Sequence, residues 1–431
     1  MKYYSLFELE NGTQFYYNSQ TNSLYNSAGD LLNLPPLKPL EWYVSEEKNH
    51  GVDTKTNAPI AIRILLGHAC NYSCTYCMQK DIGNPLERPQ SFFTETFISS
   101  VKNSLNIENL KRVELWGGEP FLYWKDMMEI MKFFDSPDRE FFISTNGSPF
   151  VQKHVDFFAT LKGRVMINLS HDAYGQEELR GEDILKNPRK VDIIKKLMAL
   201  PNVALGVGCV LSSTNYDLFA INDYFKNIAL AHDIRNLKIT VIPAKNYDET
   251  NSQNSANYII RGEDLIKFRQ MLKDFIQACL LDPKNEIYLR NNILHSPEGI
   301  INYATFLKHQ APVTIKSSCG ADANDVLSVD IQGNVRLCPH TDKSFISGRI
   351  EDIENVRIKK LDLDRKIQHC FKCPLKRLCR SSCPIKFPDE VFYSNCAFEK
   401  VWWGEIQEAA MGLLLGQGVK HIKDGLADFY K

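Results

Sequence analysis

Two groups of cysteines carry most of the chemistry that this sequence can do. The chain has twelve cysteines in 431 residues, and ten of them fall into two groups. The first group is Cys70, Cys74 and Cys77, and the second has seven members between Cys319 and Cys396. Structural disulfides are rare in a reducing cytosol, so clustered thiols there indicate metal binding or redox chemistry. The sequence therefore predicts metal or cluster sites at two places along the chain.

The first group has one ligand too few for a closed cluster. Cys70, Cys74 and Cys77 are separated by three and two residues and directly follow a predicted strand. A [4Fe–4S] cluster usually takes four thiolates, so three cysteines leave one iron open to a ligand that is not protein. This arrangement suits a site where a cofactor must touch iron directly. The alternative is a zinc site with His68 as fourth ligand, because zinc takes four such ligands.

These three cysteines resemble the signature of the radical S-adenosylmethionine (SAM) superfamily, Cys-x3-Cys-x2-Cys after the first strand of a partial barrel. The resemblance implies that the open iron chelates SAM. It also implies that an electron from the reduced cluster breaks the sulfonium bond and releases a 5′-deoxyadenosyl radical. A zinc site does not explain the further likeness at residues 116–120, which resemble the superfamily's Gly-Gly-Glu-Pro motif after the second strand.

The resemblance assigns the contacts with SAM to eight residues. Glycines let the backbone approach a ligand, and a glutamate can accept hydrogen bonds from the SAM ammonium. A serine and an arginine further along are the candidates for the SAM carboxylate and ribose. Ala173 stands where the superfamily usually has glycine, a departure that can change this loop. The eight residues are Gly117, Gly118, Glu119, Pro120, Ser144, Asn146, Ser170 and Arg180.

The seven later cysteines resemble the SPASM domain of radical SAM peptide maturases, which implies two auxiliary [4Fe–4S] clusters and three clusters in all. Seven thiols leave one of eight positions vacant, and Asp322 or Asp325 can fill it. A zinc-ribbon-like tail is the alternative. The first auxiliary cluster would take Cys319, Cys338 and Cys383, and the second would take Cys370, Cys373, Cys379 and Cys396.

The resemblance also bears on the substrate. Related sulfatase maturases have an Asp directly after the second SPASM cysteine as a base, whereas this chain has Pro339 followed by His340. This difference argues against formylglycine formation. His340 can act as a base, because the unperturbed pKa of histidine lies near neutrality, or it can be an ordinary surface residue.

The expected function is therefore a radical SAM maturase that forms an oxidative crosslink in a peptide or protein, with a flavodoxin or ferredoxin as reductant. One alternative is a radical SAM dehydrogenase or modifying enzyme that acts on a small-molecule or sugar-like metabolite. Another is a zinc-stabilised, non-catalytic binding protein.

The elements that must position these residues alternate along the chain. Apolar runs predict strands at 60–66, 112–117, 140–146, 165–170, 203–212 and 237–243, with helical patterns between them. Such alternation implies a parallel sheet with right-handed crossovers. Six units fall short of the eight of a closed barrel. The expected fold is α/β, a partial (β/α)6 TIM-like barrel with its ligands at the carboxyl ends of the strands.

The remaining segments flank this barrel. Asn11-Gly12 between alternating segments predicts a hairpin, and a final helix is expected over 397–415. Cys209 and Cys279 lie outside both groups and are expected to be small core residues. The expected domains are an N-terminal β cap (1–57), the radical SAM partial barrel (58–255), a helical connector (256–310), the SPASM domain (311–400) and a C-terminal helix (401–431).

Composition excludes some partners. Lysine and arginine number 51 and aspartate and glutamate 52, so there is no basic field to hold nucleic acid or an anionic membrane. The first residues lack the apolar core of a signal peptide, and no stretch of about 18 apolar residues occurs. A cytoplasmic protein without nucleic-acid or membrane partners is expected.

Overall fold

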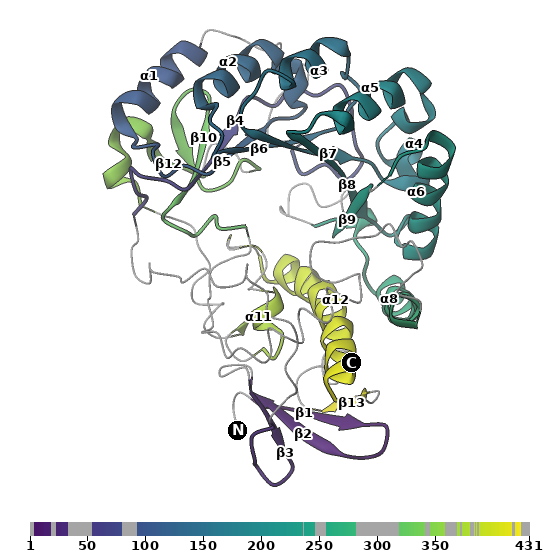
Figure 1. Cartoon of the computed structure of the whole chain (residues 1–431). Helices are drawn as coiled ribbons and strands as arrows, with labels where there is room; N and C mark the ends of the chain where they lie inside the picture. The colour runs from purple at the N-terminus through teal and green to yellow at the C-terminus, as the bar shows by residue number, and fades with distance from the viewer. Residues whose placement is uncertain are drawn as a thin grey trace.

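Six apolar runs form six adjacent parallel strands in the computed structural model (Figure 1). Each strand agrees with its predicted range to within one residue at either end, so the expected partial barrel is confirmed. The strands are β4 (Ala61–Leu65), β5 (Arg112–Trp116), β6 (Glu140–Thr145), β7 (Arg164–Ser170), β8 (Val203–Leu211) and β9 (Lys238–Pro243). The structure describes residues 4–18, 23–32, 54–79, 93–235, 237–245, 256–281, 319–340, 345–357, 369–370, 373–379, 383, 385, 388–415 and 419–423.

Helices connect the strands and cover the outer side of the sheet (Figure 1). Side-chain caps start two of them: Asn187 accepts from the Arg189 amide, and Asp217 accepts from the Phe219 amide. Such caps satisfy amides that a helix start leaves without a partner. The helices are α1 (Thr94–Ser104), α2 (Trp124–Phe134), α3 (Gln152–Phe158), α4 (Gln176–Leu179), α5 (Pro188–Ala199), α6 (Leu218–His232) and α8 (Glu263–Leu281), with 3-10 turns η2 (Pro120–Tyr123), η3 (Ala173–Gly175), η4 (Ile184–Lys186) and η5 (Ala256–Tyr258).

The main core lies between the sheet and these helices. Val113 and Leu115 of β5 are fully buried, as are the two isolated cysteines Cys209 and Cys279, which confirms their expected place in the core. Successive strand residues point to opposite faces. The other face therefore carries polar groups, and there Arg63 Nε lies 2.9 Å from Glu114 Oε2.

Three strands that the sequence did not indicate extend the sheet beyond β4. β10 (Val326–Asp330) pairs with β4 in parallel, and β11 (Asn334–Arg336) and β12 (Ile346–Arg349) follow in antiparallel order, before η7 (Ile350–Asn355). The hydrophobic pattern of residues 311–400 shows little regular period, yet the chain forms strands here. β11 and β12, with three and four residues, are too short to show a hydrophobic period. The region is thus joined to the barrel by main-chain hydrogen bonds.

A second sheet holds the two ends of the described chain together (Figure 1). The predicted hairpin at Asn11-Gly12 is confirmed, with Gly12 at φ 80° in the turn between β1 (Tyr4–Leu9) and β2 (Gln14–Asn18). β3 (Ser23–Asn26) lies beside β2. On the other side β1 pairs with β13 (Val419–Lys423), a strand where only a helix was expected. Strand β13 needs β1 as a partner, and a local pattern does not reveal such a partner.

The final helix is longer than predicted. α12 (Asp389–Leu415) begins eight residues before the expected start at 397 and carries Cys396 on its first turns. Acidic residues at Asp389 and Glu390 suit a helix start, because they face its positive end. α12 crosses the expected boundary at residue 401 and packs on α8, where Arg269 pairs with Glu405. A short helix, α11 (Lys376–Cys379), precedes it.

Parts of the expected connector and cysteine-rich domain, residues 282–310 and 311–318, lie outside the described residues, and the domain boundaries stay predictions. Across the described helices, none combines the length and the apolar character needed to cross a bilayer.

A buried lysine ties the segment before β4 to the loop before β10. The side chain of Lys55 is almost fully buried. Its ammonium donates to the carbonyl oxygens of Ala321, Ala323 and Val326 at 3.1, 2.6 and 2.8 Å. These contacts use all three of its protons. Lys55 therefore fixes the loop that directly follows Cys319.

Replacement of Lys55 by methionine is expected to lower the free energy of unfolding by about 3 kcal/mol, because three carbonyl groups lose their donor in a buried place. Urea unfolding measures this change. Lys153→Met, at an exposed position of α3, is the control and should stay within about 0.5 kcal/mol. Equal effects of the two replacements would contradict the role given to Lys55.

Candidate cluster and SAM site

The first cysteine group lies in a loop at the carboxyl end of β4, residues 66–77, here called the Cys loop. Cys74 is buried, and Cys70 and Cys77 are partly exposed. Burial raises the pKa of Cys70 and raises that of Cys74 to about 11, and the charge of Cys77 adds to both. Buried thiolates of this kind need a nearby positive charge, which coordinated metal supplies. The donor set, three neighbouring thiols in one loop, therefore fits a cluster with one open iron.

The loop after β5 packs its backbone directly on the Cys loop. Gly118 N donates to Gly67 O at 3.0 Å, and Glu119 N donates to Ala69 O at 2.8 Å. A Cβ atom on Gly118 would lie 2.4 Å from His68 O. The sequence suggested that these glycines make room for a ligand. In the structure Gly118 first makes room for the Cys loop itself.

The buried side chain of Glu119 joins the loops after β5 and β6. Its carboxylate is fully buried and accepts hydrogen bonds from Thr145 Oγ1, Asn146 N and Phe121 N at 2.7, 2.8 and 3.0 Å. Burial raises the pKa of Glu119 to about 7, although these hydrogen bonds oppose the rise. Sequence reasoning missed this bracing role, and a contact with the SAM ammonium stays a prediction. The neighbouring Pro120 begins η2 and is also buried.

The ends of β6 and β7 reach the same side of the sheet. Asn146 Nδ2 donates to Asn71 Oδ1 of the Cys loop at 3.0 Å, which joins the third strand to the cluster region. Ser144 lies on β6 and accepts from Asn168 Nδ2 at 3.4 Å. Ser170 ends β7 and is half-buried. The structure thus brings these predicted SAM contacts to one end of the barrel, together with the Cys loop.

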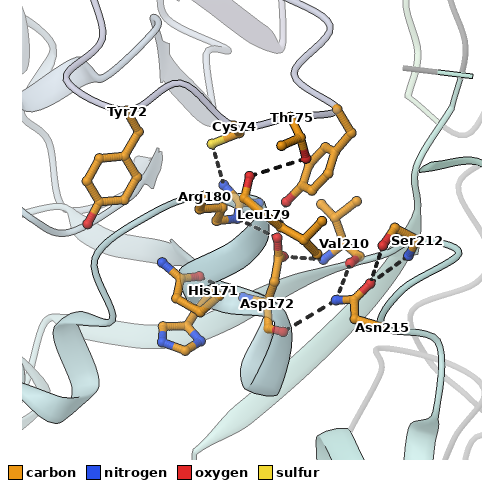
Figure 2. Close-up of polar contacts among 12 residues, drawn as sticks. Tyr72, Cys74, Thr75, His171, Asp172, Leu179, Arg180, Val210, Ser212 and Asn215 are labelled. Carbon is orange, nitrogen blue, oxygen red and sulfur yellow. Dashed lines mark hydrogen bonds and ion pairs between the residues drawn. The ribbon is translucent and has the colours of Figure 1, made fainter. Parts of the chain in front are cut away.

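Arg180 points at the Cys loop through a buried ion pair (Figure 2). Its Nε lies 2.8 Å from Asp172 Oδ2, and its Nη1 lies 3.7 Å from Cys74 Sγ. Tyr76 donates its hydroxyl to the same Asp172 oxygen, and Val210 N holds the other oxygen at 3.0 Å. Sequence reasoning gave Tyr76 and Asp172 no role. The presence of Tyr76 inside the cysteine motif could have indicated a role for it. Its partner Asp172, however, lies 96 residues away in the sequence.

Ala173 shows why glycine is usual at its position. Its φ is +51°, in the left-handed region that side chains disfavour by about 1–2 kcal/mol. Its amide donates to His171 Nδ1 at 3.1 Å, and His171 Nε2 lies 2.9 Å from Asp183 Oδ1. The loop therefore keeps the left-handed turn despite the alanine, supported by a buried polar network.

The seven later cysteines form two sets, because the pKa of a cysteine in one set is raised by burial and by other cysteines of that set. Burial raises the pKa of Cys338 to about 11 and that of Cys383 to about 12, and Cys319 contributes to both. Burial likewise raises the pKa of Cys396 to about 12, with Cys373 and Cys370 contributing, and Cys379 responds to Cys373 and Cys396. No disulfide joins any of the twelve cysteines. The two sets match the two predicted ligand groups; that they bind clusters stays a prediction.

Across the residues that the structure describes, no group of three or more His, Cys, Asp or Glu side chains is arranged to hold a metal ion. A single ion such as zinc needs its ligands about 2.0–2.3 Å from one point.

His340 is partly exposed, and its ring packs against a neighbouring aromatic side chain. Its ring meets the Trp116 ring edge-on at 4.9 Å, and its amide lies 3.5 Å from Cys338 Sγ. Burial, with the charges of Arg63 and His68, lowers the pKa of His340 to about 4. Its buried Nδ1 finds no hydrogen-bond partner in the described part of the chain. A neutral imidazole thus lies between the end of β5 and Cys338.

The two adjacent glycines give a sharp test of the loop packing. Gly118→Ala is expected to lower the free energy of unfolding by about 3 kcal/mol, because its methyl group would overlap main-chain atoms that cannot yield. In Gly117→Ala the added methyl group would lie 3.2 Å from Gly67 O. This variant should lose less than about 1 kcal/mol of the free energy of unfolding. Urea unfolding of both variants measures the difference. Equal losses would show that the close approach is not what selects glycine.

Comparison with known proteins agrees with this geometry. The model of the radical SAM superfamily matches residues 64–218. The radical SAM cyclopropyl synthase TigE of Paramaledivibacter caminithermalis is 22% identical over 376 residues, which are 80% of this chain and 72% of TigE.

Two solved structures share the fold. The structure of anSMEcpe with bound AdoMet and Cp18Cys peptide is 18% identical, with a TM-score of 0.55, and the match covers 82% of this chain and 99% of that one. SuiB from Streptococcus suis is 15% identical, with a TM-score of 0.51 and coverage of 78% and 77%. The family match spans the end of β4 through β8 and the loops around the Cys loop, so residues 64–218 of this chain are similar to the radical SAM superfamily.

Proposed function

We propose that this chain is a radical SAM maturase that abstracts hydrogen from a peptide or protein substrate and forms an oxidative crosslink. The observation that carries this proposal is the direct packing of the three-cysteine loop on the Gly118 loop at the carboxyl ends of the strands. Three thiols are presented there beside the loops that resemble SAM-binding motifs. The radical SAM match argues against the alternative of a zinc-stabilised binding protein.

In this proposal Cys70, Cys74 and Cys77 hold the [4Fe–4S] cluster, which supplies one electron for reductive cleavage of SAM. The residues around the cluster keep SAM in place and keep water out. They lie at or beyond the ends of three adjacent strands, β5, β6 and β7, so their positions follow from the sheet. The proposed SAM contacts are Gly117, Gly118, Glu119, Pro120, Ser144, Asn146, Ser170 and Arg180.

A peptide substrate is supported by the relatives. The anSMEcpe structure holds AdoMet together with a peptide. TigE is named as a cyclopropyl synthase, and closing such a ring joins two carbon atoms. By analogy we place a peptide at the barrel opening, with a flavodoxin or ferredoxin as the electron donor and the cytoplasm as the location. Which residues of a peptide are joined depends on the partner sequence.

The two later sets of thiols complete the electron balance. An oxidative crosslink removes two hydrogens from the substrate: one leaves as a hydrogen atom, and the other as a proton and an electron. The set of Cys319, Cys338 and Cys383 would hold a cluster that accepts the electron. The proton would leave to solvent, because burial lowers the pKa of His340 to about 4 and makes this imidazole a weak proton acceptor.

Metal content tests the three proposed clusters. Anaerobically reconstituted protein is expected to hold roughly twelve irons per chain (three clusters of four). It should also release 5′-deoxyadenosine from SAM on reduction. Joint replacement of Cys70, Cys74 and Cys77 by alanine should remove about four irons and abolish release. Cys279→Ala, in the core, is the matched control and should keep both. Bound zinc in place of iron would overturn the proposal.

The reaction class is tested with peptides encoded beside the gene and co-expressed with the enzyme. Mass spectrometry is expected to show a product lighter by two hydrogens, because crosslinking oxidises the substrate by two electrons. The product should disappear in the alanine variant of Cys70, Cys74 and Cys77. If instead only small metabolites are converted, the dehydrogenase alternative holds.

A further inference from the structure

The guanidinium of Arg180 is locked in one orientation toward Cys74 (Figure 2). Its Nε is committed to Asp172, a carboxylate with no exposed surface, while Nη1 faces Cys74 Sγ at 3.7 Å. Asp172 is in turn held by Val210 N and by the Tyr76 hydroxyl, from two different segments. Rotating the guanidinium would leave a buried carboxylate without its partner, which is strongly unfavourable. The positive charge therefore has a fixed place beside this sulfur.

This place has an electrostatic consequence. Arginine keeps its charge at every relevant pH, and the pair is only 10% and 0% exposed, so water screens it weakly. Hydrogen bonds to cluster sulfurs, nearby charge and burial are the means by which a protein adjusts the reduction potential of an iron–sulfur cluster. Cys74 is buried, and its sulfur lies beside the charged Nη1 donor of Arg180, so all three factors apply to it.

We propose that Arg180 and Asp172 are positioning residues that set the reduction potential of the cluster at Cys70, Cys74 and Cys77, Arg180 by raising it and Asp172 by limiting that rise. The inference rests on the proposed cluster. On reduction [4Fe–4S]2+ takes one electron from the donor and becomes [4Fe–4S]1+, with no bond formed and no proton moved. A cation beside a thiolate ligand stabilises the more negative state, and a nearby anion destabilises it.

The two residues therefore predict shifts of opposite sign. Arg180→Gln removes the positive charge and should lower the one-electron equilibrium constant for reduction at least tenfold, about 59 mV. Asp172→Asn removes the neighbouring negative charge and should raise it by a comparable factor. A purely structural role would loosen the same loop in both variants and would not separate them by sign.

The experiment is a redox titration of the reconstituted full-length protein, followed by EPR in the absence of SAM and peptide. The cluster concerned is identified afterwards as the one whose signal changes when SAM is added. A role of Arg180 in binding SAM alone predicts an unchanged potential before SAM is added. Loss of peptide modification leaves this measurement intact, so failure of the inference is distinguishable from failure of the proposed function.

Matched controls are Arg189→Gln and Asp192→Asn, which change the same charges at exposed positions of α5 and should leave the potential unchanged. Arg180→Lys retains the charge and should shift it by less than the glutamine variant. If Arg180→Gln does not take up iron, Asp172→Asn decides: a higher potential supports the inference, and an equal or lower one overturns it. Shifts of the same sign in both variants also overturn it.

Discussion

The contact between two backbones, at Gly67 to Ala69 and at Gly118, is the constraint on which the site depends. Main-chain amides of the second loop donate to carbonyl oxygens of the first, and buried amides must find such partners. The contact is so close that a side chain at Gly118 has no room. It fixes the three thiols relative to the carboxyl ends of β4 and β5. Cys70, Cys74 and Cys77 would hold the proposed cluster there, beside the loop after β5.

Buried charges occur where segments distant in sequence are joined. Lys55 links the segment before β4 to the loop after Cys319, Glu119 links the loops after β5 and β6, and Asp172 with Arg180 links the loop after β7 to the Cys loop. Each is costly to bury without its partners. A misplaced segment would therefore leave a buried charge unsatisfied. These joints favour one arrangement of loops around the thiols over alternatives that bury equal apolar area.

The sequence was a good guide wherever structure is local and periodic. Six strands, the first hairpin and the two core cysteines were foreseen, because apolar spacing and an Asn-Gly turn report directly on burial and bending. Strands β10 to β13 were missed, since each is short and depends on a distant partner. The bracing by Glu119 and the tyrosine–aspartate contact at Tyr76 were missed for the same reason. A motif names its residues, but it does not say which of them face each other.

The parallel pairing of β10 with β4 has a consequence for electron transfer. Cys70 lies five residues beyond β4, and Cys338 lies two residues beyond β11, which pairs with β10. Cys70 and Cys338 therefore follow two strands of one sheet, with β10 between those strands. Their separation cannot change without breaking a ladder of main-chain hydrogen bonds. Electron transfer between clusters at these places would accordingly occur over a fixed distance, so the potentials of the clusters, and not a movement of domains, would govern its direction.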